Sequence, residues 1–330
     1  MRIALDAMGT DEYPGPDVEG GLMAARDWGD HILFVGREDV IRRELVRHDT
    51  EGLALEVVHA SQVIEMGDEP SWAAREKKNS SMHVGMNLVR DNRADAFVTA
   101  GNTGGVLAVA TLHSLRRIRG VKRPVLAVII PLPAGRIIAL DIGANADCKP
   151  DHLVQFALMG SVYAQAVLGR SNPRVALLSN GEEPGKGNDL VKRTSKLLAD
   201  TPLNFIGNME PKDVATVQTD VIVTDGFSGN IFIKTMEATA KMLTDLIRDE
   251  IKANPVTSIG GLLAKPAFRR VARRVDPFEV GGGPLLGVNG LVIIAHGRSN
   301  ARAIRSAIGQ ARRAVEGGVL EAIRSGLAAV

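Results

Sequence analysis

Several loops of this 330-residue chain combine glycine with small polar residues directly after buried strands. Glycine lets backbone N–H groups approach a ligand closely, and helix N-termini attract anions. Any one such loop is also an ordinary turn or helix cap. Because the same composition follows strand after strand, we predict a shared anion-binding cleft. The loops read MGTDE, GNTGG, DIGAN, NGEEPGKGN, DGFSGN and HGRSN, in chain order.

The strongest anion candidate is the HGRSN loop, which leads into a helix. Gly297 allows close approach, Ser299 offers a hydroxyl, and Arg298 offers the fork geometry that suits phosphate. His296, at the end of the strand, is either a proton carrier or a structural residue. In the GNTGG loop, Asn102 and Thr103 are expected to donate hydrogen bonds to an oxyanion or a carbonyl.

The NGEEPGKGN loop holds one lysine, Lys186, between two glycines, just after Glu182 and Glu183. The lysine favours phosphate, whereas the carboxylates repel it. A Walker A loop is excluded, because that alignment puts Asn180 and Gly187 where glycine and Ser or Thr belong. From these residues alone the loop is either an anion contact through Lys186 or a loop whose carboxylates keep phosphate away.

Other catalytic patterns fail. The first strand is not followed by G-x-G-x-x-G, the seven histidines lack metal-ligand spacing, and G-x-S-x-G is absent. We therefore expect no metal and no nucleotide cofactor. Cys148 is the one cysteine, and a lone cysteine before a helix is more typical of packing than of catalysis.

Composition limits the class of protein. A net charge of +2 and 4% aromatic residues argue against nucleic-acid binding. A single cysteine fits a reducing cytoplasm. The N-terminus, MRIALDAMG, reads as a strand rather than a signal peptide, and apolar runs fall short of the roughly 20 residues that span a bilayer.

Short β-branched runs alternate with amphipathic stretches, which predicts an α/β fold with a mainly parallel sheet covered on both sides. The segments Val125–Leu132 and Arg136–Ile142, joined by PAG, predict an antiparallel hairpin. Helices are expected at Ser71–Asp91, Asp151–Val167 and Asn188–Ala199. The other strands are expected at Arg2–Ala7, His31–Gly36, Leu55–Ala60, Ala96–Ala100, Arg174–Ser179, Asn204–Gly207, Val221–Thr224 and Leu291–His296.

Residues 231–275 break the alternation and predict a protruding helical hairpin. One helix is expected to end before Pro255 and a second to follow Pro266, with Arg269, Arg270, Arg273 and Arg274 on one face. The apolar stripes fit helix packing, including packing across a dimer. Ile259, Leu262 and Leu263 are expected at the tip, where apolar side chains beside a basic face suit shallow insertion into an anionic membrane.

Taken together, these segments resemble the phosphate acyltransferases of bacterial phospholipid synthesis. The resemblance rests on ALDAMG, TAGNTGG, DIGANADCKPDHLVQF, NGEEPGKGN, VTDGFSGNIFIKT and GGGPLLGVNGLVIIAHGRSN, and it extends from Arg2 to about Ala314. It implies transfer of an acyl group from acyl-[acyl carrier protein] to inorganic phosphate. It also implies a single bilobed domain over residues 1–330 with a three-layer α/β/α, isocitrate/isopropylmalate dehydrogenase-like fold.

The resemblance further implies a cytoplasmic homodimer in peripheral contact with the membrane surface, and contact with a downstream glycerol-3-phosphate acyltransferase. Three positions depart from the family pattern: Glu12 replaces His, Asn79 replaces Asp, and Arg298 replaces Ser. From the residues and the resemblance together, we expect catalysis by His296, Asn102, Thr103 and Lys186. We expect phosphate or substrate binding by Gly101, Gly104, Asp141, Asn145, Asp225, Asn230, Gly297, Arg298 and Ser299, although the change from Ser to Arg298 leaves the phosphate contact of that side chain open.

Two other functions remain open from the residues. One is an enzyme that uses acyl-coenzyme A instead of a carrier protein. The other is a membrane-associated scaffold with a degenerate site. The basic run RRIRGVKR, from Arg116 to Arg123, is either a docking patch for the acidic carrier protein or a solvated surface.

Overall fold

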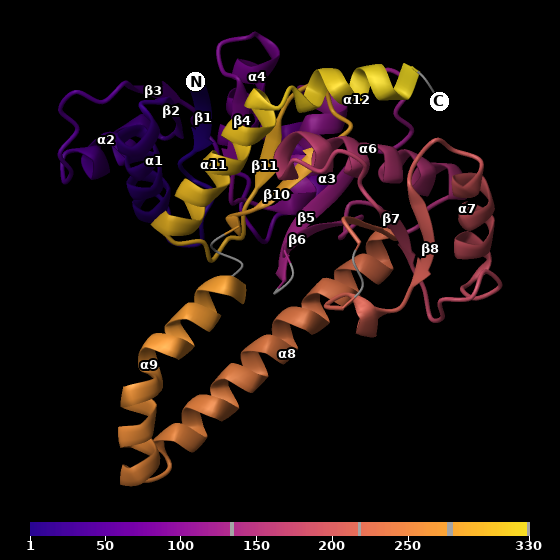
Figure 1. Ribbon diagram of the computed structural model, residues 1–330. Helices are drawn as coiled ribbons and strands as arrows, with labels where there is room; N and C mark the ends of the chain where they lie inside the picture. Colours follow the sequence, from indigo (N-terminus) through magenta and orange to yellow (C-terminus); the bar gives the residue numbers. More distant parts are fainter. Residues whose placement is uncertain (133–134, 217–218, 276–279, 329–330) are drawn as a thin grey trace.

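The computed structural model describes residues 1–132, 135–216, 219–275 and 280–328. Figure 1 shows a central sheet flanked by helices, with two long helices, α8 and α9, projecting from it. The strands lie in one sheet in the order β3-β2-β1-β4-β11-β10-β5-β6-β9-β7-β8. Their bounds are β1 Arg2–Asp6, β2 His31–Gly36, β3 Leu55–His59, β4 Ala96–Thr99, β5 Val125–Leu132, β6 Gly135–Leu140, β7 Val175–Leu178, β8 Phe205–Met209, β9 Val221–Val223, β10 Gly283–Leu286 and β11 Val292–Ile294.

Most neighbouring strands run parallel, as the sequence predicts. The exceptions are β5 with β6, β5 with β10, and β10 with β11. The predicted hairpin is confirmed, because β5 and β6 pair antiparallel with Ile129 opposite Ile138. Strand β10 was not predicted. Its sequence GPLL follows two further glycines, and glycine and proline are depleted in strands, so its place is fixed by its neighbours instead.

Helices cover both faces of the sheet. Along β1, Ile3 and Leu5 pack into a core shared with α1, α6 and α11, whereas Ala4 packs into a second core with α3, α4 and α5. Alternate side chains of a strand point to opposite faces, so a strand buried on both sides is apolar throughout. The remaining bounds are α1 Gly15–Trp28, α2 Glu38–Leu45, α3 Pro70–Glu76, α4 Ser81–Arg90, α5 Thr103–Ala108, the π-helix η1 Val109–His113, α6 Pro150–Leu168, α7 Asp189–Ala199, η2 Pro211–Asp213, α8 Gly226–Lys252, α9 Pro255–Val275, α11 Ala301–Glu316 and α12 Val319–Ala328.

The single helix predicted at Ser71–Asp91 is wrong, because the structure divides it into α3 and α4. The backbone of Lys77 leaves the helical region at φ −94° and ψ 58°. Ser80 then caps α4 by accepting a hydrogen bond from the N–H group of His83. The side chain of Glu69 caps α3 in the same way. Two polar caps therefore outweigh a continuous apolar stripe.

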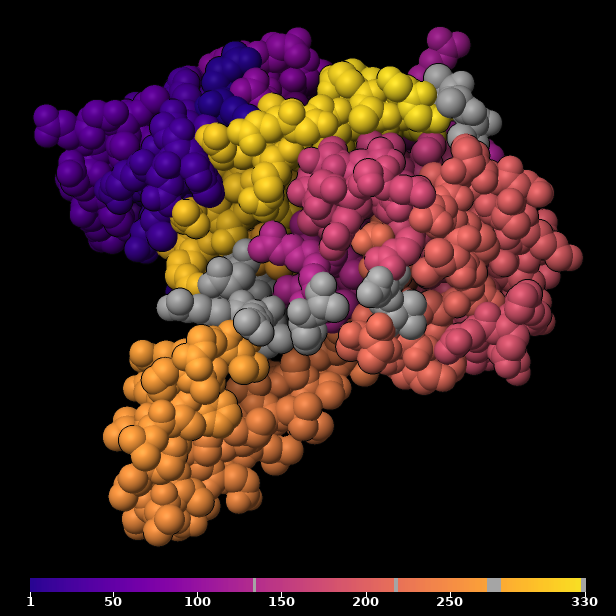
Figure 2. Space-filling model, viewed as in Figure 1, coloured from indigo at the N-terminus to yellow at the C-terminus, as the bar shows by residue number. Residues whose placement is uncertain are grey.

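The predicted long helix begins earlier than expected, at Gly226, and α9 begins at Pro255 rather than after Pro266. Figure 2 shows both helices projecting from the rest of the molecular surface. Ile259, Leu262 and Leu263 lie in the first turns of α9, at the end far from the sheet, and are 63%, 67% and 78% exposed. The side chains of Arg273 and Arg274 lie outside the described residues. Within the described part of the chain, helices are too short or too polar to cross a bilayer.

Candidate active site

Three glycine-rich loops meet where the adjacent strands β1, β4 and β11 end. We call them the Gly297 cluster: residues 8–11, 101–105 and 296–299. The N–H group of Asp11 donates to the carbonyl oxygen of Gly297 at 2.7 Å. A Cβ atom on Gly9 would lie 2.7 Å from the backbone nitrogen of Ala100. The chain therefore needs glycine there, and the predicted convergence holds for these three loops.

A buried carboxylate fixes the base of this cluster. Asp6 accepts hydrogen bonds from the N–H group of Met8 at 3.1 Å and from the Thr99 hydroxyl at 2.8 Å. The Thr99 oxygen in turn accepts from the N–H group of Gly101 at 3.0 Å. Burial raises the pKa of Asp6, and these donors oppose that rise. Thr99 was not among the predicted site residues, although a threonine ending the apolar strand AFVT is a sequence signal for this role.

Ser299 is the clearest sign of a ligand in the cluster. The residue is only 4% exposed, yet its hydroxyl has no hydrogen-bond partner among the described residues. A buried hydroxyl without a partner is costly, so such an atom in a native protein calls for an explanation. It stands just before α11, whose Asn300 cap accepts the N–H group of Ala303.

His296 is half-buried, and its backbone carbonyl oxygen accepts a hydrogen bond from the N–H group of Ser299 at 2.9 Å. Burial lowers the pKa of His296, while the Glu237 carboxylate on α8 opposes that change and Arg298 adds to it. The guanidinium of Arg298 lies 3.6 Å from Glu237. Arg298 therefore already has an ion-pair partner, Glu237 on α8. Because the pKa of His296 is lowered, its ring is mostly neutral at pH 7.

The side chain of Asn102 is fully engaged by its own chain. Its amide donates to the carbonyl oxygens of Glu65, Met66 and Asp68 at 3.1–3.3 Å. Its carbonyl oxygen accepts the N–H group of Gly105. The amide is thus occupied in this arrangement. An N-terminal helix turn has N–H groups without intrahelical partners, so those of Thr103 and Gly104 are better placed as donors.

Asn102 and Lys77 together hold the segment 63–68 over the Gly297 cluster. Lys77 Nζ donates to the carbonyl oxygen of Val63 at 2.8 Å and pairs with Asp68. A Cβ atom on Gly297 would lie 2.6 Å from Met66 Cε. The side chain of Met66 therefore lies over Gly297, and a larger residue at 297 would have to displace it.

A second group of loops, the Asp141 cluster, comprises residues 141–145 and 224–230. The carboxylate of Asp141 is fully buried and accepts hydrogen bonds from the backbone of Leu126, Gly143, Ala144 and Asn145 and from the Asn145 amide. The same amide also donates to the carbonyl oxygen of Pro124. Burial raises the pKa of Asp141, and these donors oppose it. Both side chains therefore serve mainly to shape the loop.

Helix α8 starts on this second cluster. Asp225 caps it by accepting from the N–H and hydroxyl groups of Ser228. The N–H group of Gly226 donates to the carbonyl oxygen of Asn145 at 2.8 Å. Eleven residues on, Glu237 reaches Arg298, about 17 Å along the axis at 1.5 Å per residue. Asn230 is exposed beside Gly143. One helix thus connects the two clusters.

Lys186 does not join the Gly297 cluster in this structure. Its strand β7 is separated from β11 by β10, β5, β6 and β9. Strands lie about 4.8 Å apart, which places the two strand ends about 24 Å from each other. Lys186 is exposed and packs against Gly181. A single phosphate cannot meet both Lys186 and Ser299 of one chain at that separation.

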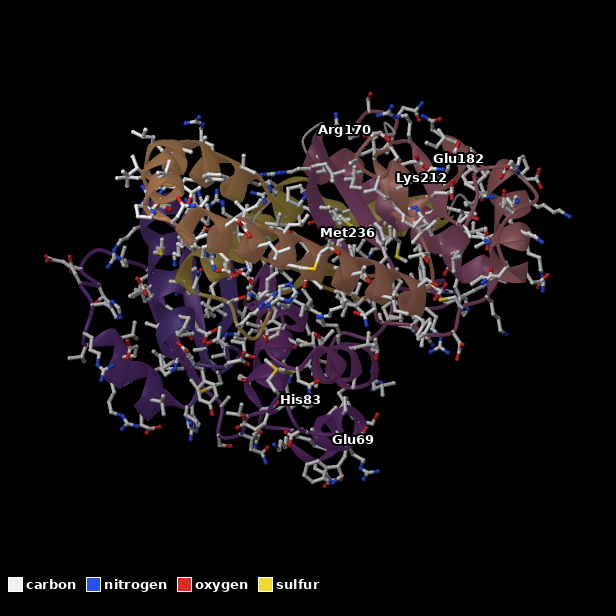
Figure 3. The ribbon with its side chains drawn as sticks, turned by 90° about the horizontal axis from the view of Figure 1, so that it is seen from below. Glu69, His83, Arg170, Glu182, Lys212 and Met236 are labelled. Carbon is white, nitrogen blue, oxygen red and sulfur yellow. The ribbon has the colours of Figure 1, made fainter. Side chains whose placement is uncertain are left out.

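Carboxylates surround the Lys186 loop instead. Glu182, Glu210 and Asp213 bring their oxygens within 4.8 Å of one another, and Lys212 pairs with Glu210 and lies 4.0 Å from Glu182. Figure 3 shows Glu182 and Lys212 together, with Glu69 and His83 on the opposite side of the view and Met236 of α8 between them. Glu182, Glu210, Asp213 and Lys212 therefore form a group of surface ion pairs that is remote from Ser299.

Cys148 is poorly suited to nucleophilic chemistry. Burial, reinforced by the nearby Asp141 carboxylate, raises the pKa of its thiol to about 12. The thiolate, which is the reactive form, is then scarce at neutral pH. This geometry agrees with the packing role expected from the sequence.

Solved structures share this architecture. A phosphotransacetylase from Streptococcus pyogenes aligns over 95% of this chain and 94% of its own, with a TM-score of 0.62 and 15% identity. A branched-chain phosphotransacylase from Enterococcus faecalis aligns over 96% and 99%, with a TM-score of 0.58 and 14% identity. The fold is therefore the mixed α/β fold found in phosphotransacylases.

Sequence relatives narrow the assignment. A family model described as fatty acid synthesis protein matches residues 1–322. A phosphate acyltransferase of a Geobacter species is 47% identical over 308 residues, 93% of this chain and 87% of that relative. Another, from Elusimicrobium minutum, is 45% identical over 99% of this chain and 96% of its own length. The chain belongs to the phosphate acyltransferase family, and the predicted resemblance is confirmed.

Proposed function

We propose that the protein transfers an acyl group from acyl-[acyl carrier protein] to inorganic phosphate. The products are an acyl phosphate and the free carrier protein, and they feed phosphatidic acid and phospholipid synthesis. Membership of the phosphate acyltransferase family supports the reaction class. The observation that carries the location is the buried Ser299 hydroxyl without a partner, within the Gly297 cluster.

Phosphate is bound, in this proposal, by Ser299, Arg298 and the backbone at Gly297. Near pH 7 phosphate is already an anionic nucleophile, so a strong general base is not needed. A phosphate oxygen attacks the thioester carbonyl, and the N–H groups of Thr103 and Gly104 stabilise the developing oxyanion. The C–S bond then breaks and the thiolate leaves. A thiol has a pKa near 8.5, so proton donation to it helps only modestly.

His296 is proposed to exchange a proton with phosphate or with the leaving thiol. Because its pKa is lowered, the ring is mostly neutral and can accept the proton of a phosphate hydroxyl. Lys186 is proposed to contact substrate only outside the Ser299 site. For Gly101, Asp141, Asn145, Asp225 and Asn230 we propose an indirect role, through the loops that bound the cleft.

The wider assignment is also a proposal. It comprises one bilobed unit over residues 1–330 with a three-layer, isocitrate/isopropylmalate dehydrogenase-like fold, a homodimer, and a peripheral, cytoplasmic membrane association. Exposed apolar side chains at Ile259, Leu262 and Leu263 support membrane contact. The acyl phosphate would then be released close to a membrane-bound glycerol-3-phosphate acyltransferase. The residues require neither a metal nor a cofactor for this reaction.

The deciding experiment is thioester consumption by the purified protein with and without inorganic phosphate. We expect consumption only with phosphate, and faster with acyl-[acyl carrier protein] than with acyl-coenzyme A. Faster reaction with acyl-coenzyme A would favour the phosphotransacetylase-like alternative. If neither donor is consumed in a phosphate-dependent way, the proposal is contradicted and the membrane-associated scaffold becomes the favoured function.

Membrane contact is tested separately. Leu262→Glu with Leu263→Glu is expected to abolish sedimentation with anionic liposomes while leaving activity on soluble substrates within about twofold, because these side chains lie on α9 far from the sheet. A matched control is Val46→Glu, an exposed apolar residue at the end of α2 and away from the hairpin. Retained liposome binding in the double variant would contradict the membrane role.

A further inference from the structure

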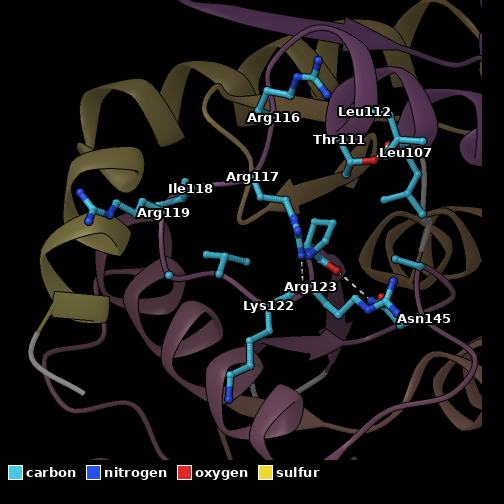
Figure 4. A pocket seen from close by; sticks show the side chains of 14 residues that line it. Leu107, Thr111, Leu112, Arg116, Arg117, Ile118, Arg119, Lys122, Arg123 and Asn145 are labelled. Atoms are coloured by element: carbon cyan, nitrogen blue, oxygen red, sulfur yellow. Dashed lines mark hydrogen bonds between the residues drawn. The ribbon is translucent and has the colours of Figure 1, made fainter.

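A cavity of about 860 Å³ opens beside the Asp141 cluster. One wall is the helix formed by α5 and η1, and another is the loop from Arg116 to Pro124. Figure 4 shows Arg119 on one side of this cavity, Arg123 beside Asn145 on the other side, and Arg116 at the top of the view. The cavity is far larger than inorganic phosphate needs and falls in the range of sites for small organic ligands.

The lining of the cavity is strongly cationic. Arg117 donates to the carbonyl oxygen of Lys122, and Lys122 pairs with Asp151. By contrast, Arg116, Arg119 and Arg123 form no ion pair with any described residue. No carboxylate is among the lining residues. Three unpartnered guanidinium groups around one cavity favour a phosphate-bearing ligand.

The apolar part of the lining points toward the Gly297 cluster. Leu107, Thr111 and Leu112 lie on the helix that begins at Thr103. At 1.5 Å per residue, Thr111 is about 12 Å from Thr103 along the axis. The cavity thus has a cationic rim, and the helix that forms its apolar wall runs on to the proposed oxyanion donors at Thr103 and Gly104. Arg116, Arg119 and Arg123 are exposed, so an anionic group can reach them from solvent, whereas a bare hydrocarbon chain would gain nothing from their charge.

We propose that this cavity binds the 4′-phosphopantetheine group of the acyl donor. The phosphate lies among Arg116, Arg119 and Arg123, and the pantetheine arm follows Leu107 and Thr111. The thioester then arrives at the N-terminal end of α5. This inference rests on the proposed function, because it assigns the donor of that reaction. Carrier protein and coenzyme A both present this group.

The first test is binding without turnover, with free 4′-phosphopantetheine in a calorimetric titration. Arg119→Ala with Arg123→Ala should weaken binding about tenfold, the loss expected for about one charge-assisted hydrogen bond. Arg116 is left in place because its backbone has a φ of 64°. The control is Arg43→Ala on α2 with Arg47→Ala, which lies just after that helix. Pantetheine without the phosphate should bind weakly and equally to wild type and variant.

The second test compares three acyl donors in the phosphate-dependent assay: carrier protein, coenzyme A, and N-acetylcysteamine, which lacks the phosphate. The Arg119 and Arg123 double variant should raise KM about tenfold for the first two and leave the third unchanged. An equal rise for all three, or a rise for the carrier alone, would overturn the inference. Unchanged phosphopantetheine binding would overturn it even if the protein catalyses the proposed reaction. Intact binding without phosphate-dependent turnover would support this site and contradict the proposed function.

Discussion

The Gly297 cluster and the Asp141 cluster have similar sequences but satisfy their polar atoms differently. In the Asp141 cluster, both oxygens of the buried carboxylate accept hydrogen bonds from the surrounding loop. In the Gly297 cluster, a buried hydroxyl is left without a partner at Ser299. A loop whose buried polar atoms are all hydrogen-bonded serves as a scaffold, whereas a loop with a buried polar atom that lacks a partner can form a hydrogen bond to a ligand. Composition alone does not separate the two.

The largest effect is expected at the scaffold. Asp141→Ala would leave four backbone N–H groups and the Asn145 amide without their acceptor in a buried place. We expect the free energy of unfolding to fall by about 3 kcal/mol or more, as measured by urea denaturation. Asp151→Ala, at an exposed ion pair, is the control. A loss below about 1 kcal/mol would show that this loop is not the scaffold we describe.

Ser299→Ala should show the opposite pattern. Removing a buried hydroxyl without a partner should leave the free energy of unfolding unchanged or slightly higher. We expect a roughly tenfold or greater loss in kcat/KM for phosphate, because a donor to the anion is lost. Ser306→Ala on α11 is a matched control. Unchanged phosphate affinity and turnover would remove Ser299 from the site.

Asn102→Ala tests a residue of the Gly297 cluster whose side-chain polar atoms all have hydrogen-bond partners, as those of Asp141 do in the other cluster. The free energy of unfolding should fall by about 1 kcal/mol through loss of the helix cap. Residues 65–68 should exchange their amide hydrogens faster, since three carbonyl anchors are lost. Faster exchange with unchanged kcat would assign Asn102 to the scaffold. Slower turnover with unchanged exchange would restore the predicted direct role of its side chain in catalysis.

Glu237→Gln probes the charge beside His296. The carboxylate raises the pKa of His296 against the effect of burial, so its removal should lower that pKa further. If the neutral ring is the working form, the acidic limb of the pH–rate profile should move to lower pH by under about one unit. Histidine NMR titration measures the pKa directly. Glu250→Gln, farther along α8, should shift neither, and a shift to higher pH would contradict the assignment.

The smallest effect is expected at Lys186. Because four strands separate its loop from the Gly297 cluster, Lys186→Ala should change KM for phosphate by less than about twofold. The phosphate dependence of the initial rate measures this. A tenfold increase would mean that Lys186 reaches phosphate by some route other than the Ser299 site of its own chain.

Local sequence patterns located most helices and strands, but they did not predict which of these elements lie side by side in the fold. Arg2–Asp6 and His31–Gly36 were located because β-branched and apolar runs bury on both faces. Strand order depends on pairings far apart in sequence. Strand β10 was missed for a different reason, because glycine and proline in its sequence GPLL are not typical of strands. The unpredicted strand order misplaced Lys186: its loop has the right composition, but the sheet inserts four strands between it and Ser299.

Residue types also did not tell which polar atoms were free. Asn102 and Ser299 both follow a strand and precede a helix, and both were predicted to touch substrate. In the structure the first is saturated by residues 65–68 and the second has no partner. That difference arises from a segment more than thirty residues away, which the spacing of a motif does not encode.

Helix α8 acts geometrically as a lever arm. The N–H group of Gly226, at its start, donates to the carbonyl oxygen of Asn145, and its residue Glu237 lies 3.6 Å from the guanidinium group of Arg298. From that anchor at Gly226, Glu237 lies about 17 Å along the rod and Lys252 about 39 Å, at 1.5 Å per residue. A rigid tilt about the anchor that moves Lys252 by about 2 Å therefore moves Glu237 by about 1 Å. Force applied at the outer end of the helix and the charge next to His296 are thus mechanically connected.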